Sequence, residues 1–206
     1  MNYPQYGIYL ILPPPVLYPL AIGHLLMSGE FKAHTGGRFM VHCTVKGFFK
    51  LAEGVTPQDF IPALDKLMAE SKAFTTQPLQ LLYHPNEGWA NGFALLLERN
   101  EPFLQLNRAV WEVVAPYIAP DCLFSARDGR GDTFYPHLTL AMSDIPRDPG
   151  LTQQASALAE YAISLVPKGN FVASDMQLIE FYSEDWAGNW FETLDFKQLK
   201  GWKLAE

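Results

Sequence analysis

Two short apolar segments, each containing a His-x-Thr pattern, constrain the fold of this chain more than any other feature. They read VHCTV at 41–45 and PHLTL at 136–140. Their β-branched and leucine flanks favour β-strands. Successive side chains of a strand point to opposite faces, so the histidine and the threonine of each segment share one face. Each segment therefore presents an imidazole and a hydroxyl side by side.

The two pairs, His42 with Thr44 and His137 with Thr139, would form a complete acid–base site if they faced one cleft. A single copy would be better explained by a strand histidine bonded to a neighbouring backbone group, but two copies in like contexts favour a shared site. One imidazole can take a proton while the other gives one, and the hydroxyls can bind phosphate oxygens as charge builds on them. The sequence leaves open which histidine is the acid and which the base.

With H-C-T-V at 42–45 and H-L-T-L at 137–140, the chain resembles the two-histidine (2H) phosphoesterases. That family is defined by two H-x-[TS]-x motifs with apolar flanks, and it includes 2'-5' RNA ligase-like proteins and cyclic phosphodiesterases. The resemblance implies an α+β fold in which two antiparallel sheets flank a central groove with helices outside. Residues 1–206 would then form a single domain of two pseudo-symmetric lobes.

The resemblance also implies an activity. The chain is expected to be a metal-independent phosphodiesterase that hydrolyses 2',3'-cyclic phosphates or 2'-5'-linked or cyclic nucleotides, without a cofactor. His42 and His137 would be catalytic, and Thr44 and Thr139 would bind the phosphate. The alternative is a non-catalytic nucleotide- or RNA-binding module that uses the same groove. The motifs specify neither the physiological substrate nor the position of the phosphate in the product.

Strand alternation adds two residues to the face of the first motif, Lys46 and Phe48. Lys46 could contact phosphate or reach solvent at the strand end, and Phe48 could stack on a base. Near the second motif, Tyr135 could form a stacking wall or pack in the core. Arg127 and Arg130 lie in a glycine-containing segment that could clamp phosphate or form a solvated loop. We predict Lys46, Phe48, Tyr135 and Arg130 as substrate-binding residues.

The remaining motifs argue against other enzyme classes. None of the other histidines, His24, His34 and His84, has Cys, Asp or Glu at a metal-ligand spacing, so we expect no required metal. The sequence contains no phosphate-binding glycine loop, dinucleotide fingerprint, serine-hydrolase elbow or zinc-protease motif.

Charge and composition limit the partners. With 15 Lys and Arg against 22 Asp and Glu, the net charge is −7, whereas a surface that tracks a nucleic-acid backbone needs clustered cations. We therefore expect a monomer that binds a small nucleotide or an RNA terminus, with no extended nucleic-acid surface and no membrane contact. A positive potential can still arise locally near the motifs, where the basic residues are Arg38, Lys46, Arg127 and Arg130.

Length and cysteine content agree with one packed domain. A chain of 206 residues that is 49% hydrophobic can bury a sizeable core. The first apolar stretch, near 6–12, is too short to span a membrane and follows no Lys or Arg, so we expect a cytoplasmic protein. Cys43 is expected in the core, and neither it nor Cys122 indicates a disulfide framework.

Hydrophobic periodicity and turn signals predict an alternation of strands and helices without a linker. Strands are expected near 5–12, 38–49, 78–83, 92–98, 135–142, 171–182 and 189–199. Helices are expected after the prolines at 13–15 and through His24 to Gly29, and near 56–73, 101–118 and 150–165, with turns at 84–88 and 188–189.

Overall fold

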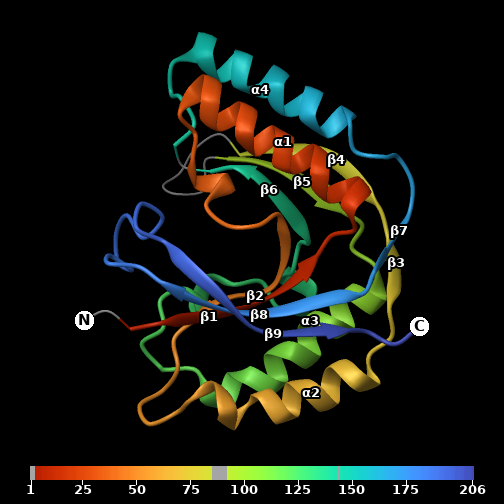
Figure 1. Cartoon of the computed structure of the whole chain (residues 1–206), viewed down its shortest axis with the longest axis vertical. Coiled ribbons are helices and arrows are strands. Elements are labelled where there is room, and N and C mark those ends of the chain that lie inside the picture. Colours follow the sequence, from red (N-terminus) through yellow and green to blue (C-terminus); the bar gives the residue numbers. More distant parts are fainter. Residues whose placement is uncertain (1–2, 85–91, 143) are drawn as a thin grey trace.

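The computed structural model describes residues 3–84, 92–142 and 144–206, and apart from His84 the turn predicted at 84–88 lies outside them. Within these residues the strands are β1 (Gln5–Ile11), β2 (His42–Phe49), β3 (Phe74–Thr76), β4 (Pro78–His84), β5 (Gly92–Leu97), β6 (His137–Ala141), β7 (Phe171–Ala173), β8 (Asp175–Tyr182) and β9 (Asp195–Lys203). The α-helices are α1 (Pro14–Phe31), α2 (Ile61–Glu70), α3 (Glu101–Val114) and α4 (Pro149–Ser164). Figure 1 shows the strands running between two pairs of helices.

The described strands form two antiparallel sheets, which confirms the predicted α+β fold. The larger sheet has seven strands in the order β4-β5-β6-β2-β1-β8-β9, and β3 pairs with β7 in the smaller one. The motif strands β2 and β6 are neighbours in the middle of the larger sheet. They are joined at one registered pair, Cys43 with Leu138, whereas β2 pairs with β1 over most of its length. The two motifs therefore approach each other across a narrow contact.

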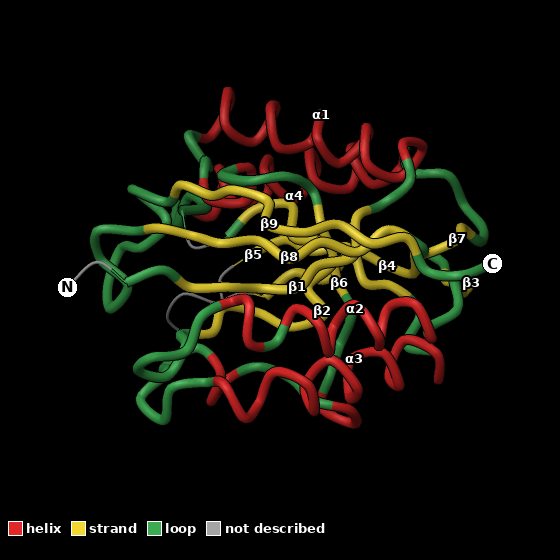
Figure 2. Tube along the Cα trace, turned by 60° about the horizontal axis from the view of Figure 1, so that its bottom comes forward, coloured by secondary structure: helices red, strands yellow, loops and turns green. Residues whose placement is uncertain are grey.

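The helices lie outside the sheet, as predicted, and they form two pairs. Helices α1 and α4 pack together against β4, β5 and β6, and helices α2 and α3 pack together against β9 and β2. Figure 2 shows the two pairs on opposite sides of the strands. Each motif strand is thus backed by its own helix pair. The pseudo-symmetry of two lobes stays a prediction.

Helix α1 is held close to the second motif by a glycine. A Cβ atom on Gly23 would lie 2.5 Å from Leu140 Cδ1 and 3.0 Å from Ala162 Cβ, so only glycine lets α1 approach β6 and α4 this closely. Pro14 and Pro15 start the helix, where their missing N–H groups cost nothing. None of the described helices combines the length and the apolar character needed to cross a bilayer.

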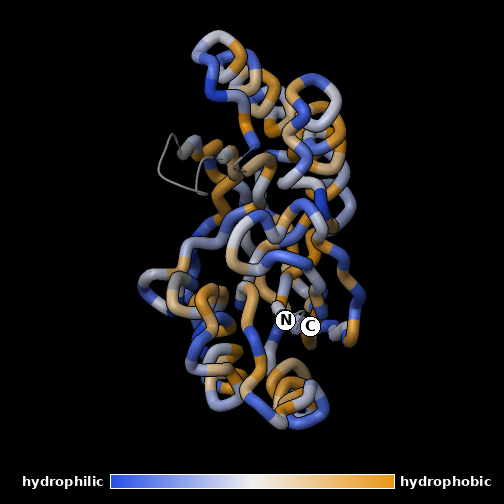
Figure 3. Tube along the Cα trace, turned by 90° about the vertical axis from the view of Figure 1, so that its left-hand side faces the viewer, coloured by the Kyte–Doolittle hydropathy of each residue, from blue (hydrophilic) through white to orange (hydrophobic). Residues whose placement is uncertain are grey.

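Side chains on the helix-facing side of the motif strands form the main core. Cys43, Val45, Leu138 and Leu140 are buried in it, so alternation holds through both motifs. Cys43 and Cys122 are buried free thiols. A second, smaller cluster contains Tyr9, Ile179, Phe181, Trp186, Trp190 and Leu194. Figure 3 shows hydrophobic and hydrophilic residues interleaved along the elements, as expected for amphipathic helices and strands.

Capping side chains define where two helices begin. Asn100 Oδ1 accepts a hydrogen bond from the Phe103 N–H at 3.2 Å, and Asp148 Oδ1 accepts one from the Leu151 N–H at 3.0 Å. The helix predicted at 56–73 begins instead at Ile61, after a short 3₁₀ turn in which Thr56 donates to the Asp59 carboxylate.

Two of the predicted strands also differ from the prediction. The strand expected at 171–182 is interrupted at Ser174, because β7 leaves the main sheet to pair with β3, a short strand that the periodicity does not predict. The strand expected from 189 begins only at Asp195. Side-chain hydrogen bonds hold the intervening loop, since Asp185 accepts from the Gly188 and Asn189 N–H groups at 3.0 Å each.

Candidate active site

Both motifs line one cavity of about 260 Å³, which contains His42, Thr44, His137 and Thr139. This volume is near the lower end of small-molecule sites, which span roughly 300–1,000 Å³. The shared face predicted for each His-x-Thr pair therefore becomes a shared site, because β2 and β6 are adjacent in the sheet.

The two imidazoles are held in the same way. His42 Nδ1 donates to the Met40 carbonyl oxygen and His137 Nδ1 to the Tyr135 carbonyl oxygen, each at 2.8 Å and each two residues earlier in the chain. A carbonyl oxygen can only accept, so Nδ1 carries its proton whether the ring is neutral or charged. Nε2 is therefore the nitrogen of each ring that gains or loses a proton.

The surroundings of the two rings differ. Phe39 stacks on the His42 ring at 4.2 Å between centroids and 19° between planes, and Tyr9 meets it edge-on at 4.8 Å. His42 is still partly exposed, but this packing removes enough water from the ring to lower its pKa to about 4. The hydrogen bond to Met40 raises the pKa, and the nearby His137 lowers it. His137, by contrast, is exposed. At neutral pH the His42 imidazole is uncharged and can accept a proton.

The two threonine hydroxyls are available to a ligand. Thr44 and Thr139 are both partly exposed, and neither hydroxyl hydrogen-bonds to another side chain or backbone group in the described part of the chain. The backbone of Thr139 is held by helix α1, since its carbonyl oxygen lies within hydrogen-bond distance, 2.9 Å, of His24 Nε2. His24 is thus a buried partner of β6, outside the cavity lining.

Lys46 departs from the predicted alternation, and its expected place near the phosphate is wrong. Ile8 of β1 pairs with Lys46 while Tyr9 pairs with Thr44, so Val45 is an extra residue and the strand bulges. Lys46 turns to the helix side, where it is fully buried, forms an ion pair with Asp128 at 2.8 Å and lies 4.3 Å from the Trp111 ring centroid.

Of the other residues predicted to bind substrate, one lines the cavity and two lie outside its lining. Phe48 lines the cavity. Tyr135 is 63% exposed, lies outside the lining and stacks against Arg99, although its carbonyl oxygen orients His137. Arg130 is exposed and pairs at 3.9 Å with Glu112, also outside the lining. The side chain of Arg127 lies outside the described residues.

Several lining residues carried no sequence signal. Tyr9, Phe124 and Trp190 form aromatic walls of the cavity together with Phe39, and Asp128 supplies a carboxylate. They belong to segments far apart in the chain, which meet only because β2 pairs with β1 and the loops after α3 and β8 fold over it. The aromatic pattern of 186–191 was the one available hint.

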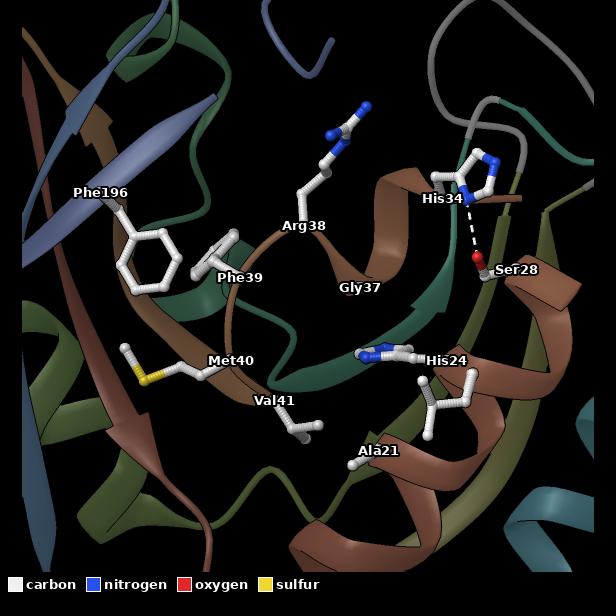
Figure 4. A pocket seen from close by; sticks show the side chains of 11 residues that line it. Ala21, His24, Ser28, His34, Gly37, Arg38, Phe39, Met40, Val41 and Phe196 are labelled. Carbon is white, nitrogen blue, oxygen red and sulfur yellow. Dashed lines mark hydrogen bonds between the residues drawn. The ribbon is translucent and has the colours of Figure 1, made fainter. Parts of the chain in front are cut away.

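A second hollow of about 900 Å³ shares Phe39 with this cavity. Figure 4 shows the rings of Phe39 and Phe196 on one side of it and that of His24 on the other, with Arg38 extending away from His24. His34 Nδ1 lies 2.6 Å from Ser28 Oγ at its edge. Phe39 therefore separates the two hollows, and Arg38 lies outside the candidate active site.

Metal-ligand side chains are not gathered in the described residues. Across 3–84, 92–142 and 144–206, no three or more His, Cys, Asp or Glu side chains lie together in a way that could hold a metal ion. The two motif histidines thus have no third ligand of these types beside them in that part of the chain.

No protein-family model matches the chain, and no curated protein matches it. Solved structures match it along nearly its whole length. The protein TT0787 of Thermus thermophilus shares 18% identity over 97% of each chain, with a TM-score of 0.65. Escherichia coli LigT in its apo form shares 17% identity over 98% of this chain and 99% of its own, with a TM-score of 0.52. A protein described as a phosphoesterase shares 15% identity over 98% of each chain, with a TM-score of 0.51. At these identities the likeness is one of fold.

Proposed function

We propose that this chain, which has the fold of the two-histidine phosphoesterases, is a metal-independent phosphodiesterase that hydrolyses 2',3'-cyclic phosphates or 2'-5'-linked or cyclic nucleotides. One observation carries the proposal. His42 and His137 line one cavity, and each has Nδ1 bound to a backbone carbonyl, which reserves Nε2 for proton exchange. This arrangement provides two separate proton-transfer groups around one substrate.

His42 is the base in this proposal. Because burial lowers its pKa to about 4, its Nε2 is unprotonated at neutral pH and can take a proton from the attacking water. The water oxygen forms a bond to phosphorus as that proton moves to His42.

His137 is the acid. It is exposed, so water can solvate its protonated form, and it lines the same cavity as the base. As the bond between phosphorus and the departing ribose oxygen breaks, His137 gives its proton to that oxygen. The product is a nucleoside monophosphate, and the two histidines have exchanged protonation states until solvent resets them.

Thr44 and Thr139 complete the site. Their hydroxyls line the cavity and can donate hydrogen bonds to the two non-bridging oxygens, where negative charge grows during the attack. LigT, whose fold this chain shares, has been solved with 3'-AMP at 16% identity and a TM-score of 0.50, and with NADP+. A nucleotide ligand for this chain is consistent with those complexes.

The test is incubation of the purified protein with nucleoside 2',3'-cyclic phosphates and with 2'-5'-linked dinucleotides. Products are followed by mass spectrometry and by phosphorus NMR, which also distinguishes 2'- from 3'-phosphates. We expect turnover that disappears in His42→Ala and persists in His34→Ala, because the His34 ring bonds Ser28 outside the cavity. Binding without product in the parent protein would favour the non-catalytic module instead.

A further inference from the structure

One charged group in the cavity has no part in the proposed hydrolysis, the carboxylate of Asp128. Its side chain is 22% exposed. A carboxylate inside a phosphate-binding cavity repels the substrate and weakens binding unless it makes a compensating contact. The presence of Asp128 in the cavity therefore needs an explanation.

The two oxygens of this carboxylate are in different situations. Oδ2 accepts from Lys46 Nζ at 2.8 Å and from the Gly47 N–H at 2.7 Å. Oδ1 has no hydrogen-bond partner among the described residues, although the side chain borders the cavity. The buried Lys46 ammonium offsets the charge of the carboxylate, which reduces its repulsion of a bound phosphate. Oδ1 is still able to accept a hydrogen bond.

Aromatic rings line the same cavity as Asp128. Phe48 meets Phe124 at 5.3 Å and Trp190 at 5.0 Å between ring centroids, both edge-on, and all three rings border the space. Nucleobases bind proteins by stacking on aromatic faces while their edges form hydrogen bonds. The cavity thus combines apolar walls with one directed acceptor.

The spacing along β2 places Asp128 at a suitable distance from the phosphate. Its carboxylate lies over Gly47, where a Cβ atom would be 3.0 Å from Oδ1. Gly47 is three residues after Thr44, but β2 bulges at Val45 and Lys46 is already paired with Ile8, so the span corresponds to about two residues of β1, or roughly 7 Å. The distance from the phosphate of a nucleotide to the hydrogen-bonding edge of its base is of the same order.

We propose that Asp128 Oδ1 accepts a hydrogen bond from the amino group at C4 of a pyrimidine or C6 of a purine, which makes the site selective for cytosine and adenine over their keto counterparts. The inference rests on the proposed function for the position of the phosphate. A carboxylate accepts from an amino group but has no proton to offer a keto oxygen, so at C4 or C6 uracil and hypoxanthine present an oxygen that Oδ1 repels. Their ring N–H donors lie one atom further along the base edge, and such a base must shift in the cavity before one of them reaches Oδ1.

The first experiment compares matched substrates on the parent enzyme. Cytidine and uridine 2',3'-cyclic phosphates differ at C4, and the adenosine and inosine compounds differ at C6. We expect kcat/KM to be higher for the amino member of each pair by roughly 10-fold or more, since one good polar contact to a base edge discriminates by about that factor. Ratios within twofold of one in both pairs would overturn the proposal.

The second experiment reverses the polarity of the contact with Asp128→Asn. The Gly47 N–H and Lys46 Nζ are both donors, so they hold the amide oxygen on their side and turn the amide NH₂ toward the cavity. That donor favours a keto oxygen, so the cytidine-to-uridine ratio should fall below one. Asp121→Asn is the matched control, because Asp121 forms a similar pair with Lys50 at 2.7 Å outside the cavity; its ratio should equal that of the parent.

An unchanged ratio in folded Asp128→Asn would show that Asp128 only ties its loop to β2. If that variant does not fold, Gly47→Ala takes its place, since the added methyl displaces the carboxylate and should abolish the preference. If no substrate is turned over by the parent, the proposed function fails. Calorimetric binding of cytidine and uridine 3'-monophosphates then decides the inference separately, and equal affinities would overturn it.

Discussion

In β2 the motif imidazole is packed between Phe39 and Tyr9, whereas in β6 the corresponding imidazole of His137 is exposed. The two strands otherwise agree closely, down to the hydrogen bond from Nδ1 to the carbonyl two residues earlier. In the proposed mechanism the hydrogen bond to Nδ1 leaves Nε2 of each ring as the reacting nitrogen, and the packing around the ring decides whether that nitrogen is protonated. The proposed acid and base roles therefore come from surroundings that lie outside the motif.

The largest expected effect comes from removing either imidazole. His42→Ala and His137→Ala should each lower kcat by roughly 10² to 10⁴, because each removes one proton-transfer group. The measurement is initial rates on a nucleoside 2',3'-cyclic phosphate, with circular dichroism to confirm folding. Near-parent activity in either folded variant would contradict a two-histidine mechanism.

A second substrate separates the roles of the two variants. A nucleoside 4-nitrophenyl phosphodiester has a leaving group that departs without protonation, so it relieves the need for an acid but not for a base. His137→Ala should recover most of its activity on this substrate, and His42→Ala should not. The opposite pattern would exchange the acid and base assignments.

Next in size is the loss of a threonine hydroxyl. Thr44→Val and Thr139→Val should each cost about 2–4 kcal/mol in kcat/KM if the hydroxyls stabilise charge on the phosphate. Thr75→Val is the matched control, because Thr75 is exposed in β3 and away from the cavity. Kinetics like those of Thr75→Val in both variants would remove the hydroxyls from the site.

A smaller effect tests the packing around His42 directly. The base must be neutral, so kcat/KM should fall as the pH drops through its pKa of about 4. Phe39→Leu uncovers one face of the ring, and added hydration should raise this pKa toward its ordinary value of 6.5 and shift the acid limb upward. Proton NMR of the imidazole and the pH–rate profile both measure the shift.

The control for this shift is Phe171→Leu, a partly buried phenylalanine of β7 that does not line the cavity. Its acid limb should coincide with that of the parent. A parent acid limb near pH 6.5 would mean that packing does not control the ionisation of His42.

The sequence predicts those parts of the site that depend only on the local geometry of a strand. A period of two places His42 and Thr44 on one face, and it does the same for His137 and Thr139, all of which line the cavity. It fails at Lys46, because the β2 bulge follows from the pairing with β1 and has no signature in the strand itself. The same limit hides β3, which exists only because β7 pairs with it.

The remainder of the site depends on contacts between distant segments. Phe39 and Tyr9, which lower the pKa of His42, lie on opposite sides of α1 in sequence, and Asp128 reaches β2 from a loop after α3. No periodicity links these residues before the chain is folded. The four motif residues that line the cavity could thus be predicted from the sequence, but the different surroundings of the two imidazoles and the place of Asp128 could not.

The smallest expected effect is that of chelators. If proton transfer between two imidazoles carries the reaction, EDTA should leave kcat/KM unchanged, because the phosphate charge is stabilised by hydroxyl donors. A metal-activated water would need about three protein ligands with an open position, and the described residues offer no such group of side chains beside His42 and His137.

The assay compares parent protein with and without EDTA, and then with added Zn²⁺, Mn²⁺ or Mg²⁺, on the same cyclic substrate. A loss of activity that one of these ions restores would break the comparison on which both assignments rest. His42 and His137 would then be ligands that share an ion, and their different surroundings would tune metal affinity rather than acid and base strength. Equal rates with and without EDTA and with each added ion would support proton transfer by the two imidazoles alone. The different surroundings of His42 and His137 would then explain why one takes the proton and the other gives it.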